Sequence, residues 1–460
     1  MLIETLKGIV GPQGWKQDEA DLEPYLREWR GRATGEALMV VSPQSTDEVS
    51  RVVGACAQAG VSVVPQGGNT GLCGGALPSA GQVLLSMSPM NRVRHVDPHD
   101  YSITVDAGCV LQDVQSAAAR EDRWFPLSLG ASVRCQIAGT LSTNAGGINV
   151  LRYGTDRQQV LGLEVVLAEG AVWDGLRTVR KDTAGYDLKQ LFLGSEGTLG
   201  IITAASLRLW PRPSALTTLL AAVPSPQHAV ELLGRLRGAF GDTVQAFELI
   251  SGLCMELVER NVPDASVRLD GVHPWHVLAD VETGSRESLM EQTMMAELDA
   301  GRVIDVVVAK NASESEGFWR MRHSLSEAQN PEGAALKHDI SVPTGWIAEF
   351  VDEGARRVET MIPGARIVAF GHVGDGNLHY DILQPVGADA AAFREAGESL
   401  TEALYDLAVG LGGSFSAEHG VGLFKRLHLE RYRGGTEIGL MRTLKAALDP
   451  QNTLNPGKVI

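Results

Sequence analysis

Residues 65–75 read Pro65-Gln66-Gly67-Gly68-Asn69-Thr70-Gly71-Leu72-Cys73-Gly74-Gly75, a glycine-rich run that directly follows the apolar segment 61–64. Glycines placed in this way let backbone N–H groups converge on an anion, because no Cβ obstructs the approach. A diphosphate is the natural ligand of such a loop. The spacing differs from Gly-x-Gly-x-x-Gly, so the fingerprint of nicotinamide dinucleotide binding is absent. On spacing alone, an irregular turn and a phosphate-binding loop are equal alternatives.

Three further loops in the first half of the chain are small, polar and flanked by apolar segments: Leu129-Gly130-Ala131, residues 137–147 and residues 194–200. Such loops suit a backbone that wraps around a large flat cofactor, and together they favour the phosphate-binding interpretation. The segments between them predict strands at 38–41, 61–65, 83–87, 102–105, 161–167 and 199–209, and helices at 46–59 and 111–120. Ser45 or Thr46 is the expected cap of the first of these helices. Pro211 and Pro213 suggest a domain boundary near residue 212.

Beyond that boundary, apolar strand-like runs alternate with helical stretches in an order typical of an α+β domain built on an antiparallel sheet. The strands are expected at 216–223, 275–281, 303–308, 366–372 and 378–383, and the helices at 227–239, 285–300 and 316–329. The tail is helical in period at 390–411 and 435–448. We therefore expect domains over 1–212 and 213–415, followed by a C-terminal segment over 416–460 that closes the active site.

Two histidines flank a Gly-Asp-Gly turn in the second half of the chain. If Gly374 to Asn377 form a four-residue hairpin loop, Val373 pairs with Leu378 and His372 falls opposite His379, about 5 Å away at Cβ. Two imidazoles so placed can share a metal ion, and Glu418 beside His419 offers a third ligand and a base. Two ordinary histidines in a hairpin are the alternative. The concentration of His in glycine-rich, turn-punctuated stretches favours the metal site.

Charge and cysteine content limit the classes of partner. The formal net charge of -16 argues against nucleic acid and anionic membranes, so an anionic substrate needs a local basic pocket. The five cysteines, none in a Cys-x-x-Cys pair, suit reduced thiols. The first residues lack an apolar region after a basic start, and no later segment approaches a membrane span. We expect a cytoplasmic protein.

Several motifs in collinear order resemble the FAD-dependent D-2-hydroxyacid dehydrogenases of the vanillyl-alcohol oxidase type, and among these most closely the D-2-hydroxyglutarate dehydrogenases. The motifs are 65–75, Leu151-Arg152-Tyr153-Gly154, 181–192, 194–203, 371–379, Glu418-His419-Gly420-Val421-Gly422 and Leu454-Asn455-Pro456-Gly457-Lys458. The resemblance implies an α+β fold with a two-subdomain FAD-binding domain of PCMH type, whose core spans about 36–212. It also implies a substrate domain over the isoalloxazine.

The resemblance further implies the site residues. FAD contacts are expected from Pro65, Gly67, Gly68, Asn69, Thr70, Gly71, Leu129, Gly130, Gly139, Ser142, Thr143, Asn144, Gly146, Tyr153, Glu196, Ile201, Ile202 and Asn455. Substrate contacts are expected from Arg322, Ser326, Lys337, Asn377 and Asp381. A divalent metal is expected at His372, His379 and Glu418; zinc suits this set, although manganese, iron and cobalt are compatible. His419 is the expected base. The flavin is expected to be non-covalent, because residues 66–75 contain no histidine and Cys73 is better explained by packing.

The expected reaction is oxidation of D-2-hydroxyglutarate to 2-oxoglutarate, with D-lactate and D-malate as alternative substrates. Asp381 stands where relatives commonly carry Asn, and an acid there would repel a second substrate carboxylate unless it were paired or protonated. Other classes left open are a flavin-independent metallohydrolase and a non-catalytic flavoprotein subunit. The expected electron acceptor is an electron-transfer flavoprotein or a quinone, and a homodimer is left open.

Overall fold

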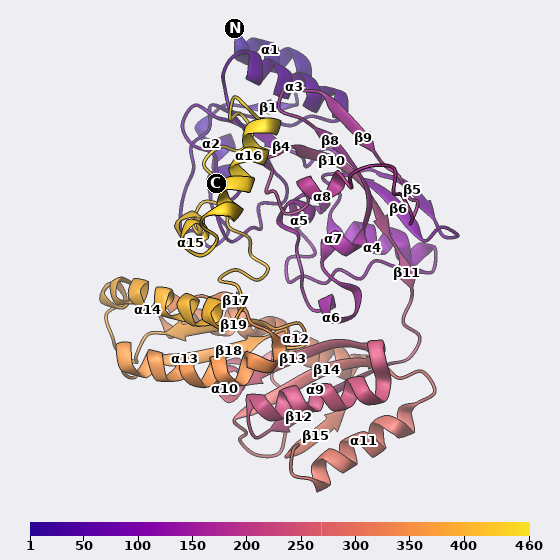
Figure 1. Ribbon diagram of the computed structural model, residues 1–460, viewed down its shortest axis with the longest axis vertical. Helices are drawn as coiled ribbons and strands as arrows, with labels where there is room; N and C mark the ends of the chain where they lie inside the picture. The colour runs from indigo at the N-terminus through magenta and orange to yellow at the C-terminus, as the bar shows by residue number, and fades with distance from the viewer. Residues whose placement is uncertain (268) are drawn as a thin grey trace. The chain divides into compact units, whose positions relative to one another are not determined.

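The computed structural model describes residues 1–267 and 269–460. Contacts divide the chain into two units (Figure 1). Unit 1 comprises Met1–Gly146, Gly154–Arg212 and Glu418–Ile460, and unit 2 comprises Gly147–Tyr153 and Pro213–Ala417. That unit 1 binds the cofactor and unit 2 binds the substrate stays a prediction. Within the described residues, no helix is both long and apolar enough to span a membrane.

Unit 1 contains two main sheets. The first has the order β1-β2-β4-β3, in which β4 pairs in parallel with both β2 and β3. The second is antiparallel, with the order β5-β6-β10-β8-β9. The strands are β1 (Trp15–Lys16), β2 (Met39–Val41), β3 (Val63–Gln66), β4 (Val83–Ser86), β5 (Val93–Asp97), β6 (Ser102–Asp106), β8 (Val160–Val166), β9 (Val172–Gly175) and β10 (Ile201–Arg208), with β7 (Arg123–Trp124) paired to β11 (Trp210–Pro211).

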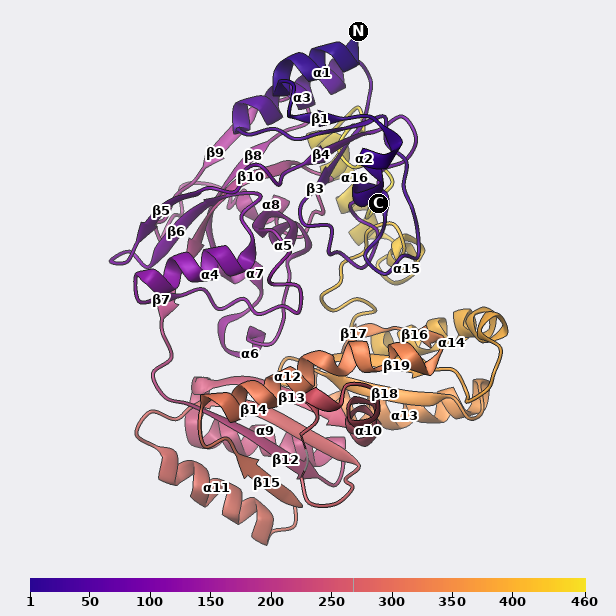
Figure 2. The same cartoon turned by 180° about the vertical axis from the view of Figure 1, so that it is seen from behind.

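Helices cover these sheets, and α1 and α3 lie side by side in both ribbon views (Figures 1 and 2). They are α1 (Leu2–Val10), α2 (Glu19–Leu26), α3 (Thr46–Gln58), α4 (Leu111–Arg120), α5 (Ile137–Thr143), α7 (Asp156–Gln159), α8 (Lys189–Phe192), α15 (Arg426–Tyr432) and α16 (Thr436–Leu448). The expected cap at Ser45 is confirmed, because its side chain accepts from the Glu48 amide. Strands β1, β5, β7 and β9 were not predicted, since they are short and carry little apolar periodicity.

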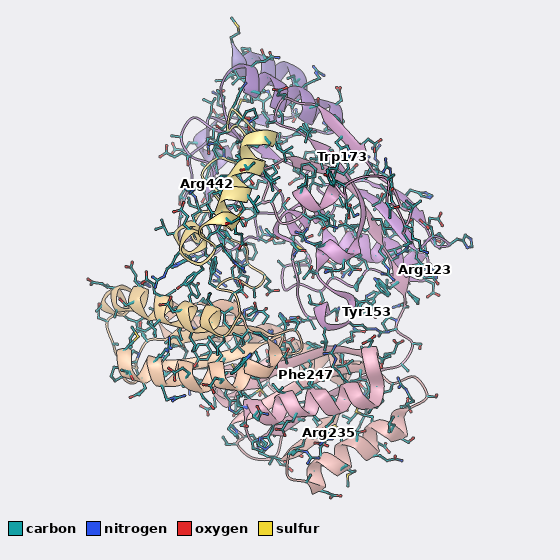
Figure 3. All side chains as sticks on the ribbon, viewed as in Figure 1. Arg123, Tyr153, Trp173, Arg235, Phe247 and Arg442 are labelled. Atoms are coloured by element: carbon teal, nitrogen blue, oxygen red, sulfur yellow. The ribbon has the colours of Figure 1, made fainter. Side chains whose placement is uncertain are left out.

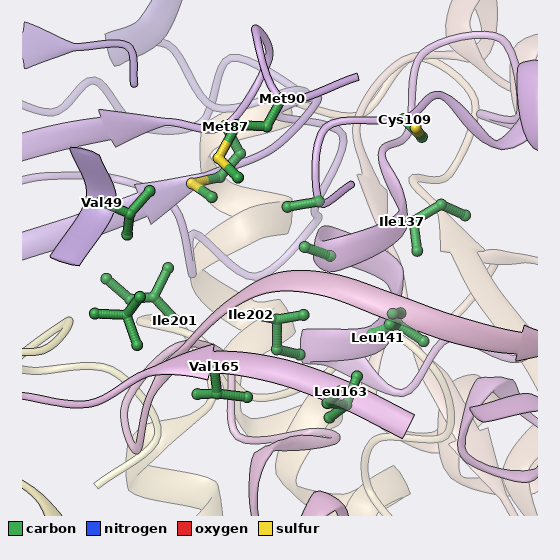
Figure 4. Packing of buried hydrophobic residues seen from close by; sticks show 14 of the residues in the cluster. Val49, Met87, Met90, Cys109, Ile137, Leu141, Leu163, Val165, Ile201 and Ile202 are labelled. Atoms are coloured by element: carbon green, nitrogen blue, oxygen red, sulfur yellow. The ribbon is translucent and has the colours of Figure 1, made fainter. Parts of the chain in front are cut away.

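The core of unit 1 is apolar and continuous between the second sheet and its helices. Figure 4 shows this packing, with Leu163 and Val165 of β8 near Ile202 of β10, and Leu141 of α5 facing the same core. All five cysteines are buried, and none of them forms a disulfide. Burial raises the pKa of the Cys56 and Cys109 thiols to about 12, so both are protonated, poor nucleophiles.

Unit 2 is built on one antiparallel sheet with the order β15-β12-β14-β13-β18-β19-β16, and β17 also pairs with β19. Its strands are β12 (Leu216–Val223), β13 (Val244–Ser251), β14 (Trp275–Glu282), β15 (Asp305–Val308), β16 (Ala335–Leu336), β17 (Asp339–Ser341), β18 (Arg366–Gly371) and β19 (Asn377–Leu383). The expected α+β class with an antiparallel second sheet is confirmed. The central strand β13 is missing from the sequence prediction.

Helices lie on both faces of this sheet, with α9 and α13 on one face and α10 and α12 on the other (Figures 1 and 2). They are α6 (Val150–Tyr153), α9 (Pro226–Phe240), α10 (Gly252–Asn261), α11 (Glu287–Asp299), α12 (Ala312–Ala328), α13 (Ile347–Met361) and α14 (Ala390–Gly410). Short 3-10 turns occur at Gly241–Thr243, Pro263–Ala265, Asn330–Glu332 and Thr344–Trp346. Figure 3 labels Tyr153 on α6 and Phe247 on β13, two elements that pack together in unit 2.

Candidate active site

In unit 2, the sheet face that α12 covers carries two buried carboxylates. Ile250 and Phe370 on this face pack with Met321 of α12. Because side chains alternate along a strand, Glu248 on β13 and Asp381 on β19 point to the same face. Both are almost fully buried, at 0% and 4% exposure. Charged groups in an otherwise apolar layer need partners, and the following contacts supply them.

The two histidines of the hairpin are close, but the predicted register is wrong. His379 pairs with Phe370, not with His372, and the His372 carbonyl accepts from the Asn377 amide. The loop is therefore 373–376, one residue earlier than predicted. The pairing is offset by one residue in each strand, which preserves the face on which each side chain lies. The two imidazoles consequently still meet, with ring centroids 5.7 Å apart.

Glu248 joins two of the predicted site residues. Its Oε1 lies 2.5 Å from Nδ1 of His372, and its Oε2 accepts from Nε of Arg322 at 2.6 Å. Burial alone would raise the pKa of Glu248, but the Arg322 guanidinium and His372 reverse that effect and lower it to about 2. Glu248 is therefore an ionised carboxylate shared by a cation and an imidazole.

Asp339 organises the opposite side of the hairpin. It is buried on β17 directly across from His379, with Oδ1 3.9 Å from the His379 Nδ1. Asn377 donates from Nδ2 to the Asp339 carboxylate at 2.9 Å and to the Ile340 carbonyl at 2.8 Å, so its amide nitrogen is used within the protein. The amide of Ala417 donates to the Asp339 carboxylate at 3.2 Å. Glu418 follows Ala417 in the chain, so this bond anchors the residue directly before Glu418.

Lys337 and Asp381 form an ion pair on this side of the sheet. The Lys337 Nζ lies 3.3 Å from Asp381 Oδ2 and donates to Gln329 Oε1 at 3.1 Å. The condition under which an acid at 381 would be tolerated is thus met by pairing. Ser326 is exposed on α12, one turn from the buried Arg322. The Ser326 hydroxyl is therefore accessible to a ligand, and the contacts of Lys337 and Asp381 do not orient it.

In unit 1, several residues expected to bind FAD converge at the end of β3. The amide of Glu196 donates to the Ser142 carbonyl, and Asn455 donates from Nδ2 to the carbonyls of Gly75 and Glu196. An added Cβ on Gly67 would lie 3.7 Å from the Gly139 amide nitrogen. The glycine-rich loop, α5, Glu196 and the C-terminal segment therefore meet at one place.

The Glu196 side chain serves the C-terminal segment. It accepts from the amides of Val421 and Gly422 at 2.7 and 2.9 Å, shortly after Glu418 and His419. Burial raises the pKa of Glu196, and the two amides oppose this shift only in part. The expectation that Glu196 contacts the cofactor is untested, but its carboxylate already has a structural use.

The loops of unit 1 fit a large polar cofactor. Among the described residues, Gln136 Oε1 and Asn455 Oδ1 are buried side-chain acceptors without a protein donor. Gln136 lies against the glycine-rich loop, because an added Cβ on Gly67 would be 3.4 Å from its Oε1. Buried acceptors of this kind are satisfied by ligand or water donors. Polar groups of a bound dinucleotide would meet that requirement.

Not all predicted FAD residues meet at this place. The Ile201 and Ile202 side chains are in the core of unit 1, so only their backbone is available to a cofactor. Tyr153 belongs to the short segment of unit 2. The Asn144 side chain accepts from the Thr155 hydroxyl and the Arg157 amide, which uses it to shape the loop. Thr70, Leu129, Gly130 and Gly146 lie in the expected loops, as do Gly71, Asn69 and Thr143.

Gln136, Glu248 and Asp339 were missed by sequence reasoning. The segment 244–251 is apolar apart from a few residues, and a Glu at its centre is a signal that a charged partner exists elsewhere. That partner, Arg322, lies 74 residues later, so no local pattern could identify it.

Gly68→Ala is expected to destabilise unit 1 by about 1–3 kcal/mol and to lower the FAD content of purified protein. An alanine Cβ at this position would lie 2.0 Å from the Arg134 carbonyl oxygen, so the loop must move. Thermal unfolding and the ratio of flavin to protein absorbance measure the two effects. Gly8→Ala is the control, because Gly8 lies on α1 outside the cofactor loops and nothing lies within 4 Å of its added Cβ. Equal thermal stability and equal FAD content in the two variants would show that the close packing of Gly68 against Arg134 does not control FAD binding.

The comparisons with known proteins agree with this arrangement. Residues 37–175 match the family described as FAD binding domain, and residues 212–459 match FAD linked oxidases, C-terminal domain. The solved structure of p-cresol methylhydroxylase with substrate bound superimposes with a TM-score of 0.80 at 17% identity, covering 100% of this chain and 96% of that one. For 4-ethylphenol oxidase from Gulosibacter chungangensis the TM-score is 0.76 at 18% identity, covering 100% and 96%. At these identities the likeness shows the fold alone.

The chain therefore belongs to the FAD-linked oxidases. Among curated relatives, D-2-hydroxyglutarate dehydrogenase of Xanthomonas citri pv. viticola is 36% identical over 99% of this chain and 96% of the relative. The mitochondrial D-2-hydroxyglutarate dehydrogenase of Danio rerio is 37% identical over 94% and 80%, and a putative mitochondrial D-lactate dehydrogenase of Schizosaccharomyces pombe is 32% identical over 100% and 90%. The chain is an FAD-dependent dehydrogenase of the D-2-hydroxyacid family, which argues against a flavin-independent hydrolase and a non-catalytic subunit.

Proposed function

We propose that this enzyme oxidises D-2-hydroxyglutarate to 2-oxoglutarate, with D-lactate and D-malate as the next candidates. The observation that carries the proposal is the set of buried or half-buried groups on the α12 face of unit 2, where Arg322, His372 and His379 lie together in a protein of net charge -16. Although Glu248 balances its charge, Arg322 retains terminal guanidinium nitrogens that can donate to an anionic substrate. The names of the relatives support the same substrate class.

In this proposal, the chain's own residues bind the substrate and remove one proton. Arg322 donates to the carboxylate next to C2, because only its Nε is used by Glu248. Lys337 and Ser326 would hold the remainder of the substrate. His419 accepts the hydroxyl proton at an imidazole nitrogen. When bound, FAD supplies the hydride acceptor at N5 and a divalent metal supplies polarisation of the hydroxyl.

His372, His379 and Glu418 would hold that metal. Two imidazoles and one carboxylate suit zinc and are compatible with manganese, iron or cobalt. Support for the set comes from the 5.7 Å separation of the two rings and from the anchoring of Ala417, the residue before Glu418, on Asp339. The predicted cytoplasmic location, the electron-transfer flavoprotein or quinone acceptor and a homodimer remain predictions.

Anaerobic flavin reduction tests the proposed function. D-2-hydroxyglutarate should bleach the flavin absorbance of zinc-loaded enzyme, and the L-enantiomer should leave it unchanged. Removing the metal with a chelator should slow the bleaching, and adding zinc should restore it. A failure of D-2-hydroxyglutarate, D-lactate and D-malate alike to reduce the flavin would reject the proposal.

Asp381→Asn is expected to improve the KM for D-2-hydroxyglutarate about tenfold relative to that for D-lactate. The change removes the carboxylate that neutralises Lys337 and frees its charge for the distal carboxylate, which D-lactate lacks. Steady-state kinetics with both acids measure the ratio. Asp299→Asn, at the exposed end of α11, is the control for loss of a negative charge. An unchanged ratio would mean that the distal carboxylate does not bind at Lys337.

A further inference from the structure

Glu248 is a buried carboxylate in unit 2 that holds both a predicted metal ligand and a predicted substrate-binding cation. It is fully buried on the central strand β13 and contacts both a predicted metal ligand, His372, and a predicted substrate cation, Arg322. The strand pairing explains this position: Leu249 pairs with Gly371, so the next pair along the ladder brings Glu248 opposite His372. Arg322 reaches the same carboxylate from α12.

The contact with His372 determines which ring nitrogen can bind a metal. A neutral imidazole carries one N–H and one lone pair. Nδ1 lies 2.5 Å from a carboxylate oxygen of Glu248, so with a neutral imidazole Nδ1 carries the hydrogen and donates it, which leaves the lone pair on Nε2. A carboxylate that receives the second N–H of a metal-binding histidine fixes both its tautomer and its ring orientation.

The contact with Arg322 fixes how that side chain can meet a substrate. Because Nε donates to Glu248, the guanidinium is restrained while its two terminal nitrogens can still donate to a ligand. The guanidinium also lies over the Phe370 ring, with Cζ 4.9 Å from the centroid. A guanidinium that is already in contact along one edge and one face loses little conformational freedom when it binds a carboxylate.

We propose that Glu248 is a positioning residue that simultaneously orients His372 for metal binding and Arg322 for substrate-carboxylate binding. The inference rests on the proposed function and adds a residue to it. Its consequence is that loss of this one buried carboxylate should weaken metal affinity and substrate affinity together, without affecting flavin binding in unit 1.

Glu248→Gln is the first test. The amide can accept from one of the two donors but presents an NH₂ group to the other, so both contacts cannot be kept. We expect the affinity for Zn²⁺, measured by competition with a chromophoric chelator, to fall about 10- to 100-fold. We also expect a higher KM for D-2-hydroxyglutarate, with wild-type FAD content. A Zn²⁺ affinity within about threefold of the wild type would overturn the proposal.

Asp280→Asn is the matched control. Asp280 is a buried carboxylate of the same sheet that accepts from Thr218 and from the Trp319 indole, away from both His372 and Arg322. If the loss of any buried carboxylate in this sheet weakened Zn²⁺ binding, Asp280→Asn would do so as well. The proposal requires that it does not.

A second variant keeps the test valid if Glu248→Gln leaves Arg322 uncompensated and the protein fails to fold. Glu248→Leu combined with Arg322→Met replaces the buried pair by apolar groups of similar size, which is often tolerated. Its Zn²⁺ affinity should be at least about tenfold below that of Arg322→Met alone, in which Glu248 still accepts from His372. Equal affinities would overturn the proposal. Wild-type enzyme that binds no Zn²⁺ and shows no flavin reduction would instead overturn the proposed function itself.

Discussion

His419→Gln is expected to lower the rate of flavin reduction at saturating D-2-hydroxyglutarate by about 10²–10⁴-fold while FAD and metal stay bound. Glutamine preserves much of the size and polarity of the imidazole but cannot accept a proton near neutral pH. In the structure the His419 side chain is 21% exposed, and its Nε2 lies 3.9 Å from a carboxylate oxygen of Glu418. An accessible imidazole beside a carboxylate is suited to accept a proton.

The measurement is stopped-flow flavin bleaching under anaerobic conditions, combined with FAD and metal content. His99→Gln is the matched control, because His99 is exposed elsewhere in unit 1. A His419→Gln enzyme that reduces its flavin at more than about a tenth of the wild-type rate would exclude His419 as the base. Loss of metal in this variant would indicate that His419 acts as a ligand.

Lys445→Met is expected to destabilise unit 1 by about 3–5 kcal/mol, the cost of removing one partner from a buried ion pair. Lys445 on α16 donates to the carbonyls of Thr198 and Leu454 and lies 2.5 Å from the Asp449 carboxylate. The bond to Thr198 attaches the C-terminal segment, which carries Glu418 and His419, to the rest of the unit, and the contacts with Leu454 and Asp449 stabilise the segment itself. Urea unfolding followed by flavin release measures the loss.

Lys181→Met is the control for this change, because Lys181 is exposed in the same unit. A difference in unfolding free energy below about 1 kcal/mol between the two variants would contradict a stabilising role for Lys445.

The effect should depend on pH with a defined sign. Burial would raise the pKa of Asp449, but Lys445 and the amides of Thr453 and Leu454 more than offset it, so the pKa is lowered. A lowered folded-state pKa means that the stabilisation is present above the unfolded value of about 3.9 and is lost as the pH falls through the folded value. The gap between wild type and Lys445→Met should therefore narrow below about pH 4.

Local pattern predicted many of the longer elements, but not β13, α10 or α13. The predicted helix at 111–120 coincides with α4 and the predicted strand at 216–223 with β12, because apolar periodicity and caps act over a few neighbouring residues. The hairpin at 372–379 was placed on the correct face, but its four-residue loop begins one residue earlier than predicted, at 373. Turn chemistry alone does not determine where this loop begins, and the pairing of β19 with β17 and β18 fixes the register.

The sequence by itself determined the glycine-rich cofactor loops, the antiparallel second domain and the identity of the histidines, because these follow from residue type and short-range spacing. Only the tertiary structure decided that Glu248 bridges His372 and Arg322, that Lys337 neutralises Asp381, and that residues 418–460 pack within unit 1. A buried charge requires a partner, but its choice depends on strand order and register across tens or hundreds of residues, which local preference does not encode.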